Sequence, residues 1–353
     1  MEELITNIHI HTRYSDGKKL HREIAEDAIK AGIDAIIITD HNMYVKGFDG
    51  YYSRNGRKVL MLVGEEIHDN TRIPQKNHML ALGINQSHAK YARSSQELIN
   101  SINKVQGLSF IAHPFDPELS TLKEDDLSWI DWSVSGFTGL EIWNNLSEFK
   151  VRVRSILAAI FFSFFPAFLA KEPPIQNRKI WDELLATGKK VSAIGGSDAH
   201  TFINNLGLFK KTIFPYSYHF KTINTHILIE NELSGDAKKD STMMLNSLRK
   251  GNAFVANDMI KPGKGFRFNL EKNGKTWIMG DEVDFSEGQI LNAYLPAEAE
   301  CVLLKDGDPV FQNRRCRQFS YPVKAPGCYR LECYRRYLFE RRGWLFSNPI
   351  YIR

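Results

Sequence analysis

The sequence has few cysteines and no long uninterrupted apolar run. All four cysteines lie in the C-terminal quarter, at Cys301, Cys316, Cys328 and Cys333. None has the close spacing of a zinc ribbon, so we expect buried free thiols; disulfides stay open for a protein that works outside the cytoplasm. The most apolar stretch, residues 156–170, contains Pro166 and is shorter than the roughly 20 residues that cross a bilayer. No transmembrane segment is therefore predicted.

The chain also lacks a strong charge of one sign, internal repeats and low-complexity segments. Its 353 residues carry a net charge of +5, with 43% hydrophobic and 25% charged residues, which is typical of a folded globular protein. No signal-peptide pattern follows Met1, which predicts a cytoplasmic location. The length fits one barrel of about 250 residues with a smaller appended domain.

Positive charge concentrates near the end of the chain. Residues 305–353 hold eleven Lys or Arg against four Asp or Glu, a local net charge of +7. Tyrosines such as Tyr329 and Tyr334 interleave with these arginines, and a solvated strand face is the favoured interpretation. Contact with nucleic-acid phosphates or an anionic surface is a second interpretation that nothing else in the sequence supports. The sequence does not define an oligomeric state.

Potential metal ligands recur at the ends of short apolar runs that are typical of buried strands. The nine ligands are His9, His11, Asp16, His41, Glu66, His78, His113, Asp198 and His200. The strand-like runs are residues 5–10, 34–39, 59–63, 79–83, 108–112, 138–142 and 191–195. One histidine beside such a run is usually a hydrogen-bonded core residue, but so many carboxylates and imidazoles in one place are favourable only with divalent cations. The pattern predicts a multinuclear metal site.

The spacing of these residues allows them to converge. His9 and His11 are two residues apart in an extended segment and so project to the same face. Metal–nitrogen bonds of about 2.0 to 2.1 Å allow both rings to reach one ion. Asp16 follows on a tight loop, and Asp198 and His200 occupy alternate positions after a buried run.

Helical patterns separate several of the strand-like runs. One run ends at Gly32, and Ser94 with Glu97 forms a capping box before another. This alternation is typical of an α/β barrel, with reactive groups where strands end and loops begin. We expect a barrel over residues 1–260. An apolar helical insertion at about 150–175 is expected to cover its mouth as part of the substrate pocket, with membrane-surface or dimer contact as the alternatives.

The pattern changes after residues 261–265. Asp240 is expected to cap the last barrel helix and Gly251 to end it. Short strand-like runs follow, separated by turn pairs such as Asn273-Gly274 and Asp306-Gly307. They predict a small antiparallel β-sandwich over residues 265–353.

Taken together, the motifs resemble those of the PHP (polymerase and histidinol phosphatase) superfamily. They are His9-x-His11 with Ser15-Asp16-Gly17, Thr39-Asp40-His41, Gly64-x-Glu66, His78, Ala112-His113-Pro114 and Gly196-Ser197-Asp198-Ala199-His200, within residues 5–258. The resemblance implies a distorted (β/α)7 TIM-like barrel, two or three divalent ions, a metal-activated hydroxide and mostly phosphoester hydrolysis. Its G-x-E motif favours Glu66 over Glu65, and His68 could join the cluster if the strand continues.

The resemblance also implies how the ligands are shared. Its pattern places His9, His11, Glu66 and Asp198 on one ion, Asp16 and His41 on a second, and His78, His113 and His200 on a third, with Glu66 bridging. Imidazole and carboxylate ligands suit Zn, Mn or Fe. Residues 254–257, 265–268 and 344–349 resemble the carbaryl-hydrolase-type metallohydrolase branch, which permits carbamate, ester or amide substrates.

The predicted function is metal-dependent hydrolysis of a small phosphorylated molecule. Asp198 and His200 are the candidates to carry protons to the leaving group, Asp40 to orient His41, and Arg13 to hold a substrate phosphate. One alternative is carbamate, ester or amide hydrolysis at the same metal centre. Another is a non-catalytic metal-dependent binding or regulatory module.

Other polar residues are candidates for supporting roles. Glu141, Asn144 and Asn145 follow the sixth strand-like run at the same mouth. We expect His21, His88 and His219 to be exposed or internally hydrogen-bonded, and His226 to lie behind the metal ligands.

Overall fold

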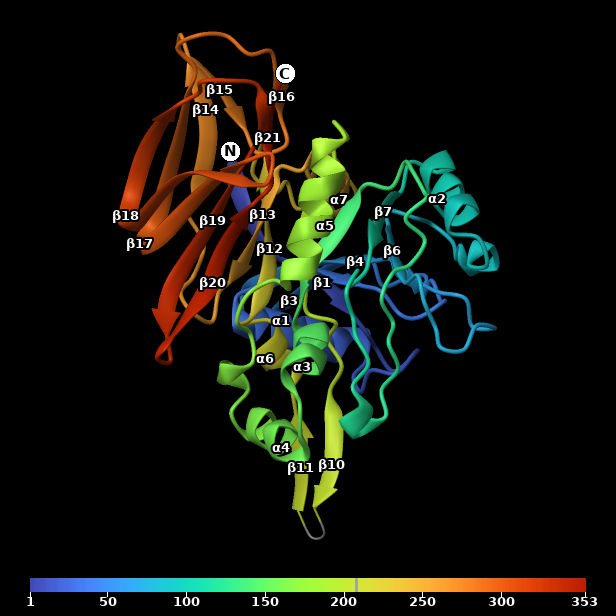
Figure 1. Ribbon diagram of the computed structural model, residues 1–353. Coiled ribbons are helices and arrows are strands. Elements are labelled where there is room, and N and C mark those ends of the chain that lie inside the picture. Colours follow the sequence, from blue (N-terminus) through green and yellow to red (C-terminus); the bar gives the residue numbers. More distant parts are fainter. Residues whose placement is uncertain (207–208) are drawn as a thin grey trace.

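The computed structural model describes residues 1–206 and 209–353 and has a mixed α/β fold in which strands outnumber helices (Figure 1). The α-helices of the described residues are α1 (His21–Ala31), α2 (Ser95–Lys104), α3 (Asn145–Arg152), α4 (Ile156–Phe164), α5 (Ile175–Ala186), α6 (Tyr216–His219) and α7 (Ala237–Lys250). The C-terminal strands, orange and red in Figure 1, lie together on one side of the molecule. Most of the helices belong to the N-terminal two thirds of the chain.

A large sheet begins in the N-terminal part of the chain. Its strands there are β1 (Glu2–Ile10), β2 (Ala35–Ile38), β3 (Gly50–Arg54), β4 (Arg57–Val63), β12 (Ile223–Ile229) and β13 (Ala253–Asn257). β1, β2 and β4 are parallel neighbours, whereas β3, β12 and β13 pair antiparallel. β2 is buried along its whole length, as its run of Ala and Ile predicts for a parallel strand covered on both faces.

A second sheet stands beside the first. It consists of β5 (Glu65–Ile67), β6 (Met79–Leu82), β7 (Leu108–Ile111), β8 (Gly139–Asn144) and β9 (Ser192–Gly196), in that order. β5, β6 and β7 pair antiparallel, and β7, β8 and β9 pair parallel. Single bridges join the two sheets: Ile10 at the end of β1 pairs with Ala199, which follows β9, and His41, which follows β2, pairs with Glu66 of β5.

A complete (β/α)7 barrel is not confirmed. Parallel neighbours need a crossover of a dozen or more residues, usually a helix. The connection from β5 to β6 carries no helix, and these strands accordingly run antiparallel. All seven predicted buried strands nevertheless form, as β1, β2, β4, β6, β7, β8 and β9.

The first two predicted helices also form, but the capping residue predicted for the last one is wrong. Ser94 caps α2 by accepting a hydrogen bond from the Glu97 amide at 3.4 Å. Asp236 caps α7 instead of Asp240, since its side chain accepts hydrogen bonds from the Lys238 and Lys239 amides. Asp240 lies one turn into the helix, where it accepts a hydrogen bond from Tyr51 at 2.6 Å.

Residues 265–353 contain only strands. They are β14 (Arg267–Lys272), β15 (Lys275–Ile278), β16 (Glu282–Val283), β17 (Ile290–Lys305), β18 (Asp308–Pro322), β19 (Gly327–Tyr337), β20 (Glu340–Ser347) and β21 (Ile350–Ile352). β20 pairs with β13, so hydrogen bonds join these strands to the large N-terminal sheet. All four cysteines are buried free thiols in this part, as predicted.

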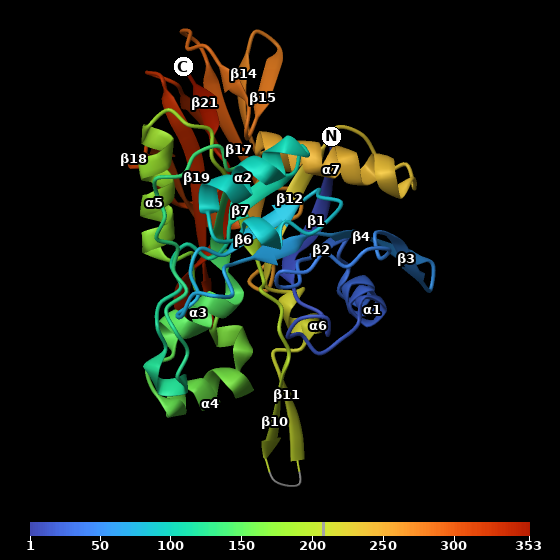
Figure 2. The same cartoon turned by 90° about the vertical axis from the view of Figure 1, so that its right-hand side faces the viewer.

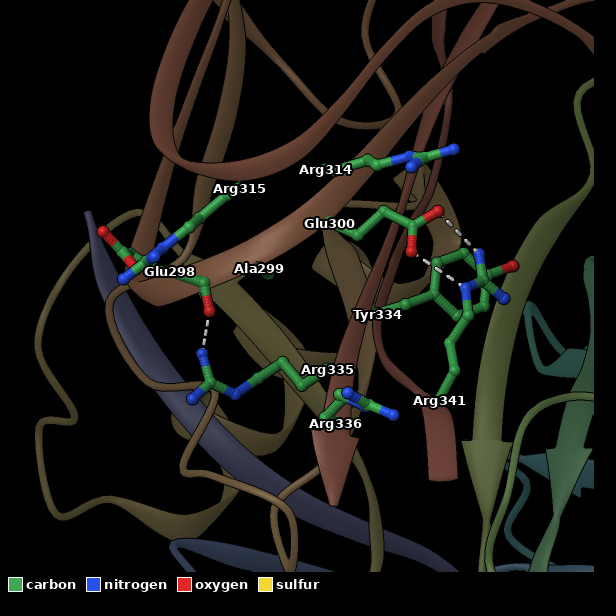
Figure 3. A pocket seen from close by; sticks show the side chains of 9 residues that line it. All are labelled: Glu298, Ala299, Glu300, Arg314, Arg315, Tyr334, Arg335, Arg336 and Arg341. Atoms are coloured by element: carbon green, nitrogen blue, oxygen red, sulfur yellow. Dashed lines mark hydrogen bonds and ion pairs between the residues drawn. The ribbon is translucent and has the colours of Figure 1, made fainter. Parts of the chain in front are cut away.

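The arginines of the C-terminal strands do not form one solvated face. Arg330 and Arg342 are 2% and 1% exposed, which contradicts that interpretation for these two residues. Arg330 holds Asp182 of α5 through two hydrogen bonds of 2.7 Å. Others line a hollow of about 660 Å³, where Figure 3 shows Arg341 paired with Glu300 at 2.9 and 3.1 Å.

The apolar segment at residues 156–170 forms α4 and a short turn after it. Both views place α4 beside the hairpin of β10 (Phe202–Leu206) and β11 (Phe209–Ile213), which projects from the molecule (Figures 1 and 2). Phe162 of α4 packs in a small apolar core with Phe214, which follows β11. Within residues 1–206 and 209–353, no helix combines the length and apolar character that a bilayer crossing requires.

Candidate metal centre

The structure brings all nine predicted ligands into one cluster. The side chains form four overlapping groups, and within each group the ligand atoms lie within 4.8 Å of one another. The groups are His9, His11, Glu66 and Asp198; His11, Asp16, His41 and His200; Glu66, His78 and His113; and His41, His68 and His78. Because the groups share members, they form one continuous centre.

Glu66 lies at the middle of this centre. Its Oε1 atom is 2.9 Å from Nδ1 of His78 and 3.0 Å from Nε2 of His113. Its Oε2 atom is 3.0 Å from Nε2 of His9, 3.2 Å from Nε2 of His11 and 3.1 Å from Nδ1 of His41. Each carboxylate oxygen therefore faces a different set of imidazoles, as expected for a bridging ligand.

The second carboxylate, Asp198, faces the same imidazoles from the end of β9. Its Oδ1 atom lies 3.4 Å from Nε2 of His9 and 3.2 Å from both Nε2 of His11 and Nδ1 of His200. Nε2 of His200 is in turn 2.9 Å from Oδ1 of Asp16. Asp16 has a half-exposed side chain, so it marks the outer edge of the centre.

Unusual backbone conformations place three of the ligands. His9, His113 and Asp198 have φ angles of 69°, 28° and 50°, in the left-handed region that non-glycine residues rarely adopt. At His9 the pairing register of β1 with β2 shifts, so β1 is bulged there rather than regularly extended. Such strain typically persists at functional sites, where the surrounding structure enforces it.

Glu141 on β8 supports the ligands from behind. It is fully buried and lies 2.9 Å from Nδ1 of His9, the ring nitrogen that faces away from Glu66. Its other oxygen accepts hydrogen bonds of 2.9 Å from the His113 amide and from Asn144. Gly196 allows this approach, because a Cβ there would lie 1.8 Å from the Glu141 carboxylate. Glu141 therefore orients both histidines.

Charge pairing keeps the central carboxylates ionised. Burial alone would raise the pKa of Glu66, but His9, His41 and the other imidazoles hold it well below its usual range. The pKa of Asp198 is lowered for the same reason. Burial lowers the pKa of His78 to about 3, which leaves that imidazole neutral. Burial alone would also lower the pKa of His113 and His200, but the neighbouring carboxylates raise these pKa values to about 9 and about 10, so both rings would have to release a proton to bind a metal ion.

The geometry of the ligand atoms fits divalent ions. Ligands that share one ion at about 2.1 Å lie about 3.0 to 3.4 Å from each other, depending on the coordination angle. The contacts between Glu66, Asp198 and the imidazoles span 3.0 to 3.4 Å at their shared face. Several of these buried atoms have no hydrogen-bond partner among the described residues, including Nε2 of His9, Nε2 of His11 and Oε2 of Glu66. A bound cation would satisfy them.

The structure places Glu66, and not Glu65, in the centre. Glu65 points away and accepts hydrogen bonds from Ser87 at 2.6 Å and from the His88 amide at 2.8 Å. His68 does lie next to the ligands, with its ring stacked on His78 at a centroid distance of 4.4 Å. Burial lowers the pKa of His68 to about 4.

Two supporting roles expected from the sequence differ in the structure. Asp40 accepts hydrogen bonds from the Thr12 amide and hydroxyl at 2.7 Å and from Ser15 at 2.6 Å, so it fixes the loop before Asp16 rather than orienting His41. Arg13 is exposed and is absent from the lining of the cavity described below, so its predicted role in substrate binding gains no support.

The remaining histidines are all buried, and His88 and His219 are internally hydrogen-bonded, which was one of the two predicted alternatives. His21 stacks on Phe48 at 3.9 Å, and neither ring nitrogen has a hydrogen-bond partner among the described residues. His88 hydrogen-bonds Ser101 at 2.8 Å. His219 lies 3.2 Å from the backbone oxygen of His200 and therefore backs a candidate ligand. His226 bonds Glu3 and Asp258 instead of lying behind the ligands.

A cavity of about 1000 Å³ opens above the centre. Its polar floor includes Asp16, His41, Glu66, His78, His113, Asp198 and His200. Asp116 and Lys150 lie in its wall as an ion pair of 3.1 Å. Sequence analysis missed both residues, although Asp116 follows three positions after His113. A small molecule in this cavity would reach the ligand cluster directly.

Comparison with known proteins identifies a class for this region. Residues 7–146 match the family model of the PHP domain. This span holds the candidate ligands from His9 to His113, whereas Asp198 and His200 lie beyond it. The resemblance noted from the motifs is thus confirmed for less than half of the chain.

Individual relatives are more distant. The chain is 29% identical over 122 residues to an uncharacterized protein of Methanocaldococcus jannaschii, covering 31% of this chain and 68% of that protein. It is similar to a two-domain protein of Bacteroides vulgatus containing a predicted PHP-like metal-dependent phosphoesterase, at 13% identity, 99% and 95% coverage and a TM-score of 0.45. It is also similar to a proposed metal-dependent phosphoesterase of Bifidobacterium adolescentis, at 16% sequence identity and a TM-score of 0.33. This second likeness covers 55% of this chain and 86% of that protein. With both TM-scores below 0.5, these two likenesses define neither fold nor activity.

Proposed function

We propose that this protein is a metal-dependent phosphoesterase whose ions are held by the nine clustered side chains. One observation carries the proposal: ligand atoms from separate strand ends converge at the floor of one cavity, and several buried ones, including Oε2 of Glu66, have no hydrogen-bond partner among the described residues. The PHP-domain match over residues 7–146 favours phosphoesters among the substrates of metal-dependent hydrolases. Two or three ions of Zn, Mn or Fe suit this donor set.

The side chains divide the proposed work between them. Bound ions would supply Lewis acidity and lower the pKa of a water molecule towards neutrality. Glu66 presents one oxygen to each side of the cluster and is proposed to bridge two positions. Asp198 and His200 both line the cavity, 3.2 Å apart, and are proposed to transfer a proton to the leaving group.

The domain organisation is part of the same proposal. We propose a barrel over residues 1–260 and a β-sandwich over residues 265–353. The single bridges between the two sheets support a ring of strands around the centre, and a separate apolar core beneath the C-terminal strands supports the sandwich. The carbaryl-hydrolase-type branch remains a proposal that rests on three short sequence segments.

A substrate panel with two histidine variants tests the activity. We expect para-nitrophenyl phosphate to be hydrolysed faster than para-nitrophenyl acetate or an aryl carbamate, and chelation to abolish turnover. His113→Ala should lower kcat/KM at least about a hundredfold, because it removes a candidate ligand. His88→Ala is the control, since His88 is equally buried but lies outside the cluster.

Other outcomes of this panel point elsewhere. Full activity in metal-free protein would refute the mechanism, and equal losses in both variants would refute the assignment of His113. Faster carbamate turnover would favour the alternative substrate class. Metal binding without turnover of any substrate would favour a binding or regulatory module.

A further inference from the structure

The cavity above the cluster has two chemically different ends. The metal-binding side chains form its floor, and apolar side chains form much of its wall, among them Leu119, Leu122, Phe149, Ile160, Phe164 and Phe214. A mostly apolar pocket with a few convergent polar groups is the usual form of a small-molecule site. Its polarity therefore indicates what kind of molecule fits.

Helix α4 supplies an apolar stripe to this wall. Ile156, Ile160 and Phe164 recur every four residues, so they lie on one helix face, and all three line the cavity. They are 61%, 50% and 53% exposed, so a ligand could cover them further. Ser163 also lines the cavity, but its hydroxyl donates a hydrogen bond to the Ala159 carbonyl at 2.7 Å. It therefore adds little polarity to this part of the wall.

The helix is fixed in place over the cavity. Ala159 and Phe162 of α4 are buried in a core that includes Leu119 and Phe214, and Arg152 donates to the Leu169 carbonyl at 2.7 Å. The stripe is therefore part of the folded wall.

The cation in the wall is already neutralised. Lys150 contacts Asp116 at 3.1 Å and the Asp125 carbonyl at 2.7 Å, and its side chain is 9% exposed. An anionic group in the cavity would consequently be drawn to ions on the floor, away from the apolar wall.

We infer that the cavity selects phosphoesters whose alcohol part is a large apolar group. The phosphoryl group lies at the ligand cluster, and the apolar group covers the stripe of Ile156, Ile160 and Phe164 on α4. This inference rests on the proposed phosphoesterase function and adds its substrate class.

Binding of two phosphonates tests the inference without requiring turnover. In titration calorimetry of the metal-loaded protein, octylphosphonate should bind at least about tenfold tighter than methylphosphonate, because the added methylenes leave water for the apolar wall. Ile160→Ser should lower that affinity ratio about threefold or more. Leu157→Ser is the matched control: Leu157 lies on the same helix, is 79% exposed and does not line the cavity, so the ratio should stay unchanged.

Three results would overturn the inference. The first is equal affinity of the wild-type protein for both phosphonates, and the second is no binding of either. The third is an equal effect of the two serine variants, which would remove the stripe from recognition. A preserved affinity ratio in a protein that hydrolyses no phosphoester would instead contradict only the proposed function.

Discussion

At the scale of single residues, the metal centre depends on which of two adjacent glutamates faces inward. Successive residues on a strand point to opposite faces, so Glu65 and Glu66 cannot both enter the cluster. Glu66 meets five imidazoles, whereas Glu65 meets Ser87 and His88. A shift of one residue in β5 would therefore remove the central ligand.

Glu141 is expected to act on metal binding through His9. Replacing it in Glu141→Gln keeps the shape but removes the negative charge beside Nδ1 of His9, which fixes the ring and raises its basicity. The affinity for the metal should fall about tenfold to a hundredfold, as measured by competition with a chromogenic chelator. An unchanged affinity would show that Glu141 has only a packing role.

The sequence was sufficient to predict which side chains cluster, but not how each of them is positioned. The clustered side chains lie in, just before or shortly after short buried strands, and this signal is local. Glu141 was a candidate for a supporting role, but its contact with His9 joins segments far apart in the sequence, so no local pattern reveals that partner. The contact of His219 with His200 joins α6 to the segment after β9 and is not visible in a local pattern either. The strain at His9 and Asp198 is likewise imposed by the surrounding fold.

At the scale of secondary-structure elements, short apolar runs and glycine stops located most of the N-terminal strands and helices. The hairpins were missed. β3 was not anticipated although the turn dipeptide Asn55-Gly56 joins it to β4, and the hairpin of β10 and β11 was not anticipated either. The apolar helix α4 was anticipated as a helix of the folded protein. Its apolar stretch is too short for a membrane span and is interrupted by Pro166.

Two helix-ending glycines provide a matched test of local packing. Gly32 and Gly251 follow α1 and α7 with φ angles of 79° and 81°, so alanine at either position should destabilise the fold by about 1 kcal/mol. Gly251→Ala should cost more, since its Cβ would lie 2.9 Å from Oγ of Ser192, whereas the Gly32 site is open. Urea unfolding measures both; equal losses would contradict this packing difference.

At the scale of the whole molecule, a buried ionic group connects the first strands to the C-terminal part. His226 on β12 lies 2.7 Å from Oε1 of Glu3 and 3.0 Å from Oδ2 of Asp258. Glu3 also accepts a hydrogen bond of 2.9 Å from the Gly265 amide and pairs with Arg267. The pairing of β13 with β20 crosses the same boundary.

This group should make stability depend on pH. Burial by itself lowers the pKa of His226, but the Asp258 and Glu3 carboxylates raise it from 6.5 to about 9. Its stabilisation is therefore fully present below about pH 6.5 and is lost as the pH rises through about 9. The difference in unfolding free energy between wild type and His226→Gln should shrink by up to about 3 kcal/mol between pH 6 and pH 9.5 in urea. A constant or growing difference would contradict this role.

The account of the whole protein depends on cations held by side chains from separate strands, and the bound-metal content tests this most directly. Elemental analysis of wild type, Glu66→Gln and Glu65→Gln, prepared with the same metal, compares two neighbouring buried glutamates of one strand. We expect two or three divalent ions per chain in wild type and Glu65→Gln, and fewer in Glu66→Gln. Metal-free wild-type protein, or the same metal content in Glu66→Gln as in wild type, would contradict the central claim.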